Sequence, residues 1–326
     1  MLDRTNDIMR YSLQASAQIG LLALSLALTP HLACAAETGD LEALRAEALS
    51  LVNEARDESG LEPLELQKIL NEAAQAHAED MLQRNYYAHV SPEGETVKDR
   101  YRDSGGSRWK LVAENIAMCS GCSSPPSLER VRSFHEGWMG SLAHRENILT
   151  EGLDGFGFGI AGEDRNVYAV QTFAGPGMPI DLKPGEETVA LQADELAQRL
   201  ARILNRERER EGLAPVKASE ALSQLANKLL PERSDEKLIA DPGNLFGLLP
   251  QSQAGDWTTL NVLAAGCGGC GTAPTAADLR YFADQWLDNP NNRQTLLADA
   301  ASHIGLAMHA NGEGRKIAIA VVGRQR

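Results

Sequence analysis

The chain has 326 residues, of which 43% are hydrophobic and 23% are charged, values typical of a folded protein that exclude an intrinsically disordered one. Its 31 Lys and Arg residues against 45 Asp and Glu residues give a net charge of −14 at pH 7. This acidic balance argues against a nucleic-acid partner and against an anionic membrane surface, because both require a basic face. The length corresponds to about two domains of ordinary size.

The N-terminal region predicts an export signal. An apolar run at residues 19–29 is too short to span a bilayer, Arg10 precedes it, and the small-residue triplet Ala-Cys-Ala at 33–35 follows it as a cleavage site. We therefore expect residues 1–35 to be a signal peptide. The mature protein is then exported, to the periplasm or outside the cell, and has no transmembrane span.

Two alternatives stay open in this region. Cys34 could carry a lipid anchor, although His31 stands where the lipidation signal has an aliphatic residue. Met9 is a second candidate for the initiator besides Met1, because Asp3 and Asp7 are unusual in a positively charged leader.

After the leader, hydrophobic periodicity predicts a mixture of helices and strands. Helices and hairpin-connected strands that segregate along the chain favour an α+β fold over a doubly wound sheet. The elements expected in the first half are helices over 41–58, 66–84 and 128–142 and strands over 156–161 and 167–173.

The rarest residues show that the chain repeats itself. Two tryptophans and a C-x-x-C pair recur 148 positions later in one register, which indicates a duplication. A stretch rich in Gly and Pro at 175–187 predicts the linker between a domain at 41–174 and a repeat at 188–326. The matched residues are Trp109 with Trp257, Trp138 with Trp286, Cys119 with Cys267 and Cys122 with Cys270.

The run RERERE at 206–211 alternates in charge inside a predicted helix. We interpret it as a solvated helix face with intrahelical ion pairs.

Three motifs resemble those of the CAP superfamily (cysteine-rich secretory, antigen 5 and pathogenesis-related proteins; the SCP domain) in its bacterial form. They are NYYAHVSPEGETVKDR at 85–100, AENIA at 113–117 and GWMGSLAHRENIL at 137–149. The resemblance implies an α-β-α sandwich with a surface cleft, present here as two tandem modules.

The family's tetrad of two His and two Glu, often found with a divalent metal, implies a site here. His89, Glu114 and His144 match three of its positions, and imidazole with carboxylate suits zinc or another divalent cation. The second glutamate is absent, because Ser141 stands in its place. Glu136 is a candidate substitute. Glu114 could alternatively serve as a structural cap.

The second repeat has lost this set of residues. Val262 stands at the position of Glu114, Asn292 at that of His144 and Asp284 at that of Glu136. We interpret the repeat as a degenerate CAP-like copy that serves as a packing partner or a recognition surface.

Each half carries one C-x-x-C pair. In an exported protein we expect each pair, Cys119 with Cys122 and Cys267 with Cys270, to form a local disulfide. A four-thiolate zinc site that joins the halves is the alternative.

Three functions are open, and the resemblance implies candidates for the first two. The one we favour is the binding of a lipid, a cell-envelope component or a protein ligand in the His/Glu cleft. A metal-dependent, peptidase-like hydrolase is the second, with His89 and His144 activating water and Glu114 as the general base. No H-E-x-x-H or G-x-S-x-G motif supports it, so we lean against an enzyme. A structural envelope protein is the third.

Overall fold

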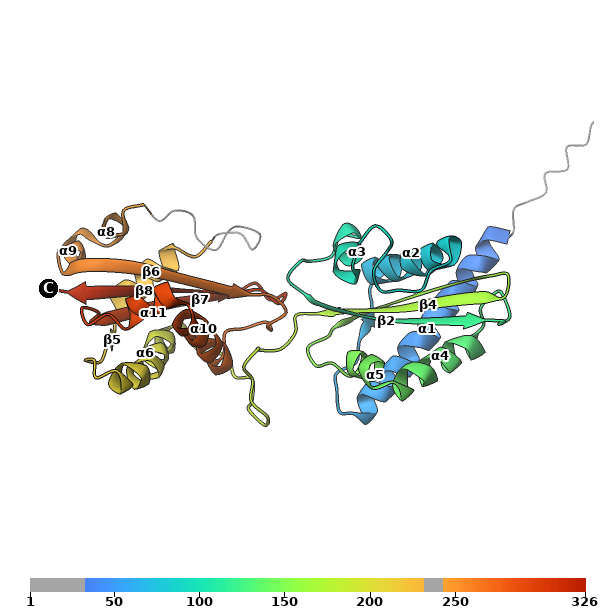
Figure 1. Cartoon of the computed structure of the whole chain (residues 1–326), viewed down its shortest axis with the longest axis horizontal. Coiled ribbons are helices and arrows are strands. Elements are labelled where there is room, and N and C mark those ends of the chain that lie inside the picture. The colour runs from blue at the N-terminus through green and yellow to red at the C-terminus, as the bar shows by residue number, and fades with distance from the viewer. Residues whose placement is uncertain (1–32, 232–242) are drawn as a thin grey trace, which may run out of the picture. The chain divides into compact units, whose positions relative to one another are not determined.

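The computed structural model describes residues 33–231 and 243–326 (Figure 1). The apolar run of the expected signal peptide and both candidate initiators lie outside these residues. No helix within the described ranges is both long and apolar enough to cross a membrane.

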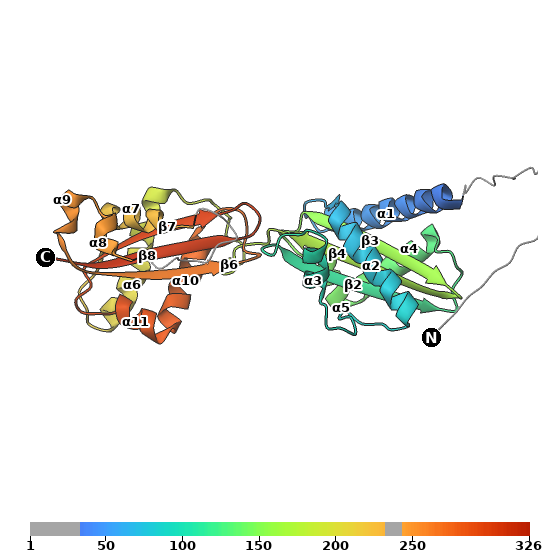
Figure 2. The same ribbon diagram turned by 90° about the horizontal axis from the view of Figure 1, so that it is seen from above.

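The first module is a four-stranded sheet between two layers of helices. The strand order is β1-β3-β4-β2, antiparallel except for the short parallel pair β1 and β3. Helices α1, α4 and α5 cover one face of the sheet, and α2 and α3 cover the other (Figures 1 and 2). Its elements are α1 (Ala33–Glu58), β1 (Glu65–Leu66), α2 (Lys68–Arg84), α3 (Val97–Asp103), β2 (Leu111–Ser120), α4 (Leu128–Gly140), α5 (Leu142–Ile148), β3 (Gly155–Glu163) and β4 (Asn166–Gly175).

Alternation along the strands produces the two cores of this module. Phe156 and Phe158 on β3 are fully buried against α1 and α4, together with Trp138. Tyr168 and Val170 on β4 point to the opposite face and pack against α2. This is the α-β-α sandwich that the resemblance implies, and it confirms the α+β class.

Several elements of this module differ from the sequence-based expectation. Strands β1 and β2 and the short helices α3 and α5 were not foreseen. The helix expected over 128–142 ends instead at Gly140, because Ser141 has an extended backbone (φ −100°, ψ 125°) that breaks α4 from α5. Helix α3 begins at a capping box in which Thr96 and Asp99 exchange hydrogen bonds.

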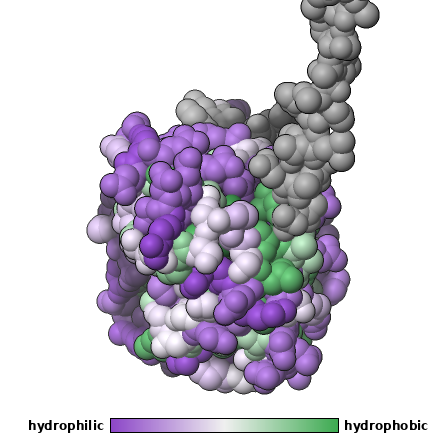
Figure 3. Space-filling model, turned by 90° about the vertical axis from the view of Figure 1, so that its right-hand side faces the viewer, coloured by the Kyte–Doolittle hydropathy of each residue, from purple (hydrophilic) through white to green (hydrophobic). Residues whose placement is uncertain are grey.

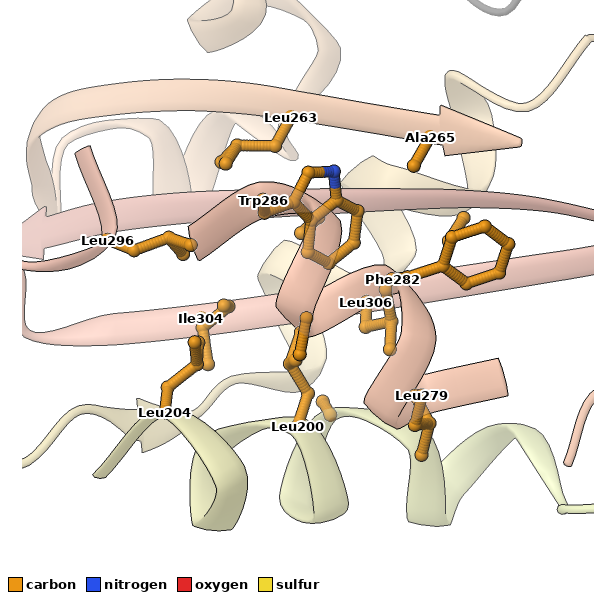
Figure 4. Packing of buried hydrophobic residues seen from close by; sticks show 14 of the residues in the cluster. Leu200, Leu204, Leu263, Ala265, Leu279, Phe282, Trp286, Leu296, Ile304 and Leu306 are labelled. Atoms are coloured by element: carbon orange, nitrogen blue, oxygen red, sulfur yellow. The ribbon is translucent and has the colours of Figure 1, made fainter. Parts of the chain in front are cut away.

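The second module repeats this architecture. Its strand order is β5-β7-β8-β6, and Figure 4 shows Trp286, Phe282 and Leu200 in the core between the sheet, α6 and α10. Its elements are α6 (Ala193–Arg210), β5 (Lys217–Ala218), α7 (Glu220–Lys228), α8 (Leu245–Leu248), α9 (Gln251–Ala254), β6 (Trp257–Cys267), α10 (Ala276–Asp288), α11 (Pro290–Leu296), β7 (His303–Ala310) and β8 (Lys316–Gln325).

A buried arginine on the first helix joins two distant segments in each module. Arg56 donates to the carbonyl oxygens of Glu62, Ile148 and Thr150, and Arg208 does the same in the second module, with four carbonyl acceptors. The interpretation of the RERERE run as a solvated face is therefore wrong at Arg208, which is completely buried. The charges around it do form surface pairs, such as Arg210 with Glu207.

Both cysteine pairs form the expected local disulfides. Cys119 pairs with Cys122 at the end of β2, and Cys267 pairs with Cys270 after β6. All four sulfurs are thereby used, so the oxidised protein offers no four-thiolate zinc site.

Candidate functional site

Strand β2 holds Glu114 at the centre of the site. Its side chain is only 2% exposed, and both of its oxygens are engaged. His89 Nδ1 lies 2.9 Å from Oε1, and Arg100 Nη2 lies 2.7 Å from Oε2. A buried carboxylate needs such partners, because an unpaired charge loses its hydration without compensation.

Arg100 supplies the compensating charge and also shapes the loop before α3. Its guanidinium donates to the carbonyl oxygens of His89 and Glu95, each at 3.0 Å. Arg100 thus holds the carboxylate of Glu114 and also the backbone of His89, which bonds to the same carboxylate. Arg100 is itself buried, so the network is shielded from solvent on this side.

The hydrogen bond to Glu114 determines what His89 presents. With Nδ1–H donating to the carboxylate, the neutral ring carries its free lone pair on Nε2. The His89 side chain as a whole is 52% exposed. Glu114 therefore acts as a positioning group for His89.

A ladder of amides docks α5 onto β2 and brings His144 to the site. Asn115 donates to the carbonyl oxygen of His144 at 3.0 Å and to Gln171 at 3.1 Å. Asn147 donates to the carbonyl oxygen of Glu114 at 3.1 Å and to Asn115 at 2.9 Å. The two motifs that contain Glu114 and His144 are thus joined by their own asparagines.

Burial and the neighbouring His89 both lower the pKa of His144 below that of an ordinary histidine. The ring is therefore predominantly neutral at pH 7, and it can accept as well as donate a hydrogen bond.

Large apolar side chains lie exposed close to these histidines in the chain. Tyr87 and Val90 flank His89, and Leu142 begins the helix that carries His144. On the face shown in Figure 3, hydrophilic residues dominate and apolar ones occupy a smaller area. These three side chains are therefore the candidates for an apolar contact beside the histidines, since exposed apolar groups that gather in one patch mark a binding surface.

The arrangement does not fit a three-ligand metal site. Within residues 33–231 and 243–326, no group of three His, Cys, Asp or Glu side chains is placed to hold an ion. A cation at Glu114 would have to displace His89 or lie next to the Arg100 guanidinium, which repels it.

The candidate fourth ligand lies apart from this network. Glu136 is exposed on α4, and it acts electrostatically on the buried His135. No hydrogen bond or ion pair connects it with Glu114 in the described part of the chain.

The second module replaces the polar network with hydrocarbon. Leu263 and Ala320 are buried at the positions of Asn115 and Gln171, as the paired registers of β2 with β4 and β6 with β8 show. The second module therefore lacks the amide ladder as well as the site residues that Val262 and Asn292 replace.

Sequence reasoning found His89, Glu114 and His144 but missed the residues that hold them in place. Arg100 is the last residue of the first motif, and its distance from Glu114 along the chain gave no signal. Asn115 and Asn147 were visible inside the two other motifs, and only the docking of α5 on β2 reveals their role.

Comparison with known proteins gives the following matches. The family model described as CAP, the cysteine-rich secretory protein family, matches residues 49–173 and 201–323. Two proteins of Bacillus subtilis (strain 168) are similar: the uncharacterized protein YkwD, 32% identical over 119 residues, and the uncharacterized membrane protein YlbC, 33% identical over 120 residues. The matches cover 36% and 37% of this chain but only 43% and 31% of the two relatives.

Among solved structures, an extracellular protein containing a SCP domain from Bacillus anthracis str. Ames is 28% identical, with a TM-score of 0.34. This match covers 40% of each chain.

Proposed function

Because the chain belongs to the cysteine-rich secretory protein (CAP) family and has two CAP modules in tandem, we propose that its first module is a ligand-binding domain that uses the surface around His89 and His144. The leader pattern at residues 1–35 supports action outside the cytoplasm. The second module lacks the histidines and the carboxylate, so binding at this site belongs to the first module.

The observation that carries the proposal is the buried Glu114, whose two oxygens are both occupied. This arrangement orients His89, whose side chain is 52% exposed, so the polar part of the site is preorganised. Val90 follows His89 in the chain and Leu142 precedes His144 by two residues, and both are exposed apolar side chains. The ligand that best matches is amphipathic, a lipid or lipid-like envelope component with a polar head on the histidines.

A fluorescent lysophospholipid below its micelle concentration is a suitable probe. We expect saturable binding to the wild type and a loss of roughly tenfold or more in the His89→Ala/His144→Ala variant, which removes two ligand hydrogen bonds. Leu142→Ser weakens the apolar contact separately. His309→Ala, on an exposed residue of the second module, is the matched control. Equal binding by the wild type and the double variant would overturn the proposal.

Zinc calorimetry on the oxidised protein tests the metal hypothesis. Since Glu114 is already engaged, we expect no stoichiometric zinc binding. If the wild type binds one ion and the His89→Ala/His144→Ala variant does not, the histidines form a metal site after Glu114 has rearranged. A free-thiol assay on the same sample excludes the cysteine pairs as ligands.

Hydrolysis is a second candidate function, favoured by the bond between Glu114 and His89. A carboxylate that orients an imidazole is the usual support of a general base. In this arrangement His89 is the base, and Glu114 positions it, which differs from the sequence-based role of Glu114 as base. Peptide turnover that disappears in a folded His144→Ala variant would favour this function over binding alone.

A further inference from the structure

The two modules protect the outer edge of their sheets differently. In each sheet the short first strand pairs with only the beginning of its neighbour, which leaves the rest of β3 and β7 as an edge. An unpaired edge presents a row of free N–H and C=O groups and can pair with another chain. How each module treats these groups can be compared residue by residue.

In the first module, side chains of α1 and α2 cap the edge of β3. Arg45 donates to the carbonyl oxygen of Phe158, and the Phe158 amide donates to Asn71. Gln75 satisfies both backbone groups of Ile160, each at 3.1 Å. All four outward-facing groups of these two strand residues therefore have partners.

The equivalent positions in the second module follow from shared landmarks. Gly157 and Gly305 each lie against the matching turn of the helix above, at Leu70 and Leu222. Asn71 and Gln75 thus correspond to Ser223 and Asn227, and the buried arginines of the first helices align Arg45 with Ala197. The outward-facing strand residues become Leu306 and Met308.

Only one of the four caps survives this replacement. The amide of Leu306 donates to Ser223 at 3.2 Å. Ala197 has no donor to offer the carbonyl oxygen of Leu306. Asn227 is one methylene shorter than Gln75, and across the described ranges its side chain forms no hydrogen bond with Met308.

Helix α7, above the edge of β7, is also shorter than α2 and packs less closely on its strand. A Cβ on Gly159 would lie 2.3 Å from the backbone of Ala74, so α2 touches β3 there. The second module has Ala307 at this position, and α7 cannot approach β7 as closely. Helix α7 ends at Lys228 after 9 residues, whereas α2 runs for 17.

A groove of about 880 Å³ lies where the caps are missing. Its floor is the edge residues Leu306 and Met308, and its walls are α6 and α7. Asp194 and Glu220 line it with carboxylates that form no ion pair within the described residues. The one lysine of the lining, Lys228, donates instead to the carbonyl oxygen of Leu248.

We propose that this groove binds an extended peptide of a partner protein, which adds a strand to β7 and places a basic side chain against Asp194 and Glu220. Among the described residues, the carbonyl of Leu306 and the amide and carbonyl of Met308 face outward from β7 with no partner, and they repeat at the two-residue spacing of a peptide strand. Pairing with a second copy is disfavoured, because it brings together two acidic grooves of chains that each carry a net charge of −14.

The test measures binding of fluorescent ten-residue peptides with alternating Thr and Val and one Lys or Arg at each position in turn. We expect the full chain to bind a subset of this panel. N-methylation of the amides that face β7 weakens binding roughly tenfold or more, because it removes main-chain hydrogen bonds. Replacement of the basic residue by Glu has a similar effect.

Two variants place the effect at this edge. Ala197→Arg/Asn227→Gln restores the caps of the first module and abolishes binding. Met308→Pro removes only the outward-facing amide, which an edge strand tolerates, and also abolishes binding. Gln285→Arg on the exposed face of α10 adds the same charge elsewhere and leaves binding unchanged, and circular dichroism confirms that each variant is folded.

Three results would overturn the proposal. The first is that no peptide of the panel binds. The second is equal binding of N-methylated and unmodified peptides, or binding that survives both edge variants. The third is a concentration-dependent dimer that the edge variants abolish while no peptide binds, which would identify a second copy as the occupant.

Discussion

The centres of the two sheets solve the same packing problem with opposite chemistry. In the first module, Glu114, Asn115 and Gln171 place a charge and two amides in the interior. Glu114 and Asn115 have partners there, and Gln171 accepts from Asn115, whereas the buried Nε2 of Gln171 has no partner among the described residues. In the second, hydrocarbon occupies these positions, with Leu263 and Ala320 buried. The fold therefore does not require the polar network, which supports the binding role proposed for the first module.

What both modules keep is equally informative. Arg56 and Arg208 share three equivalent carbonyl acceptors, and Trp138 and Trp286 occupy equivalent positions in the cores of their modules. These residues define the frame of the module, whereas the residues around Glu114 define its site. Four perturbations sharpen this separation.

The largest effect is expected from Glu114→Ala. It leaves the Arg100 guanidinium buried without its carboxylate, which costs about 3–5 kcal/mol in the free energy of unfolding. Val262→Ala, the matching change in the second module, removes only methyl groups and costs about 1 kcal/mol. Hydrogen-exchange mass spectrometry on the full chain assigns each loss to its module.

A control distinguishes the charge from the packing. In Glu114→Ala/Arg100→Met the orphaned cation is gone, so much of the stability returns. A double variant as unstable as Glu114→Ala would contradict the account of the network.

The next effect is expected from the shared frame. Arg56→Ala leaves three carbonyl acceptors without donors, and Arg208→Ala leaves four. Each substitution costs about 3 kcal/mol in urea unfolding. Arg206→Ala, on the exposed side of the same helix, serves as control and is expected within about 0.5 kcal/mol of the wild type. A loss from either substitution as small as that of Arg206→Ala would contradict a structural role for these arginines.

The disulfides of the two modules differ in their exposure to solvent and therefore to a reductant. Cys267 and Cys270 are buried, and the pair at Cys119 and Cys122 is partly exposed. Mild reductant followed by alkylation should therefore label the first pair sooner. Reduction of either disulfide opens a four-residue loop, which lowers the free energy of unfolding by about 2 kcal/mol in the chain-entropy model. Faster labelling of the second pair would contradict this order.

A smaller effect is expected from pH. Burial lowers the pKa of His77, His135 and His144 in the first module, whereas in the second only His303 shows a lowered pKa. The unfolded chain then binds more protons than the folded one, so stability is lost as pH falls from about 7 to 5.

The first module is consequently the more acid-sensitive of the two. Hydrogen exchange of its peptides should accelerate first on acidification. His77→Gln should narrow the difference in acid sensitivity between the two modules. If hydrogen exchange accelerates in both modules at the same pH, these histidines are not the cause.

The sequence was sufficient for the α+β class and the two modules. The motif resemblance pointed to His89, Glu114 and His144, whose role at a site stays a prediction. Period-3.6 runs indicated the long helices, and the repeated tryptophans revealed the second module. Strand β2 escaped because Glu114 and Asn115, two polar residues in the interior of the sheet, interrupt its hydrophobic pattern. The role of Arg100 escaped because ion pairing depends on tertiary approach, which leaves no periodic trace in the chain.

The edge of β7 escaped for a different reason. Asn227 and Ala307 are ordinary residues for a helix and a strand. They acquire meaning only when the first module shows what stands in their place, Gln75 and Gly159. In a duplicated chain, each module thus shows which residues stand at the equivalent positions of the other.

The buried arginines also bear on the order of folding during synthesis. Arg56 lies on the first helix of its module, but its acceptors Ile148 and Thr150 are 92 and 94 residues further along the chain. The first helix therefore cannot be locked until nearly the whole module has been made. Strand β4 closes the first module at Gly175, before any residue of α6 is needed. Each module can thus complete its core in turn, and a pause between them leaves a finished domain rather than an exposed half.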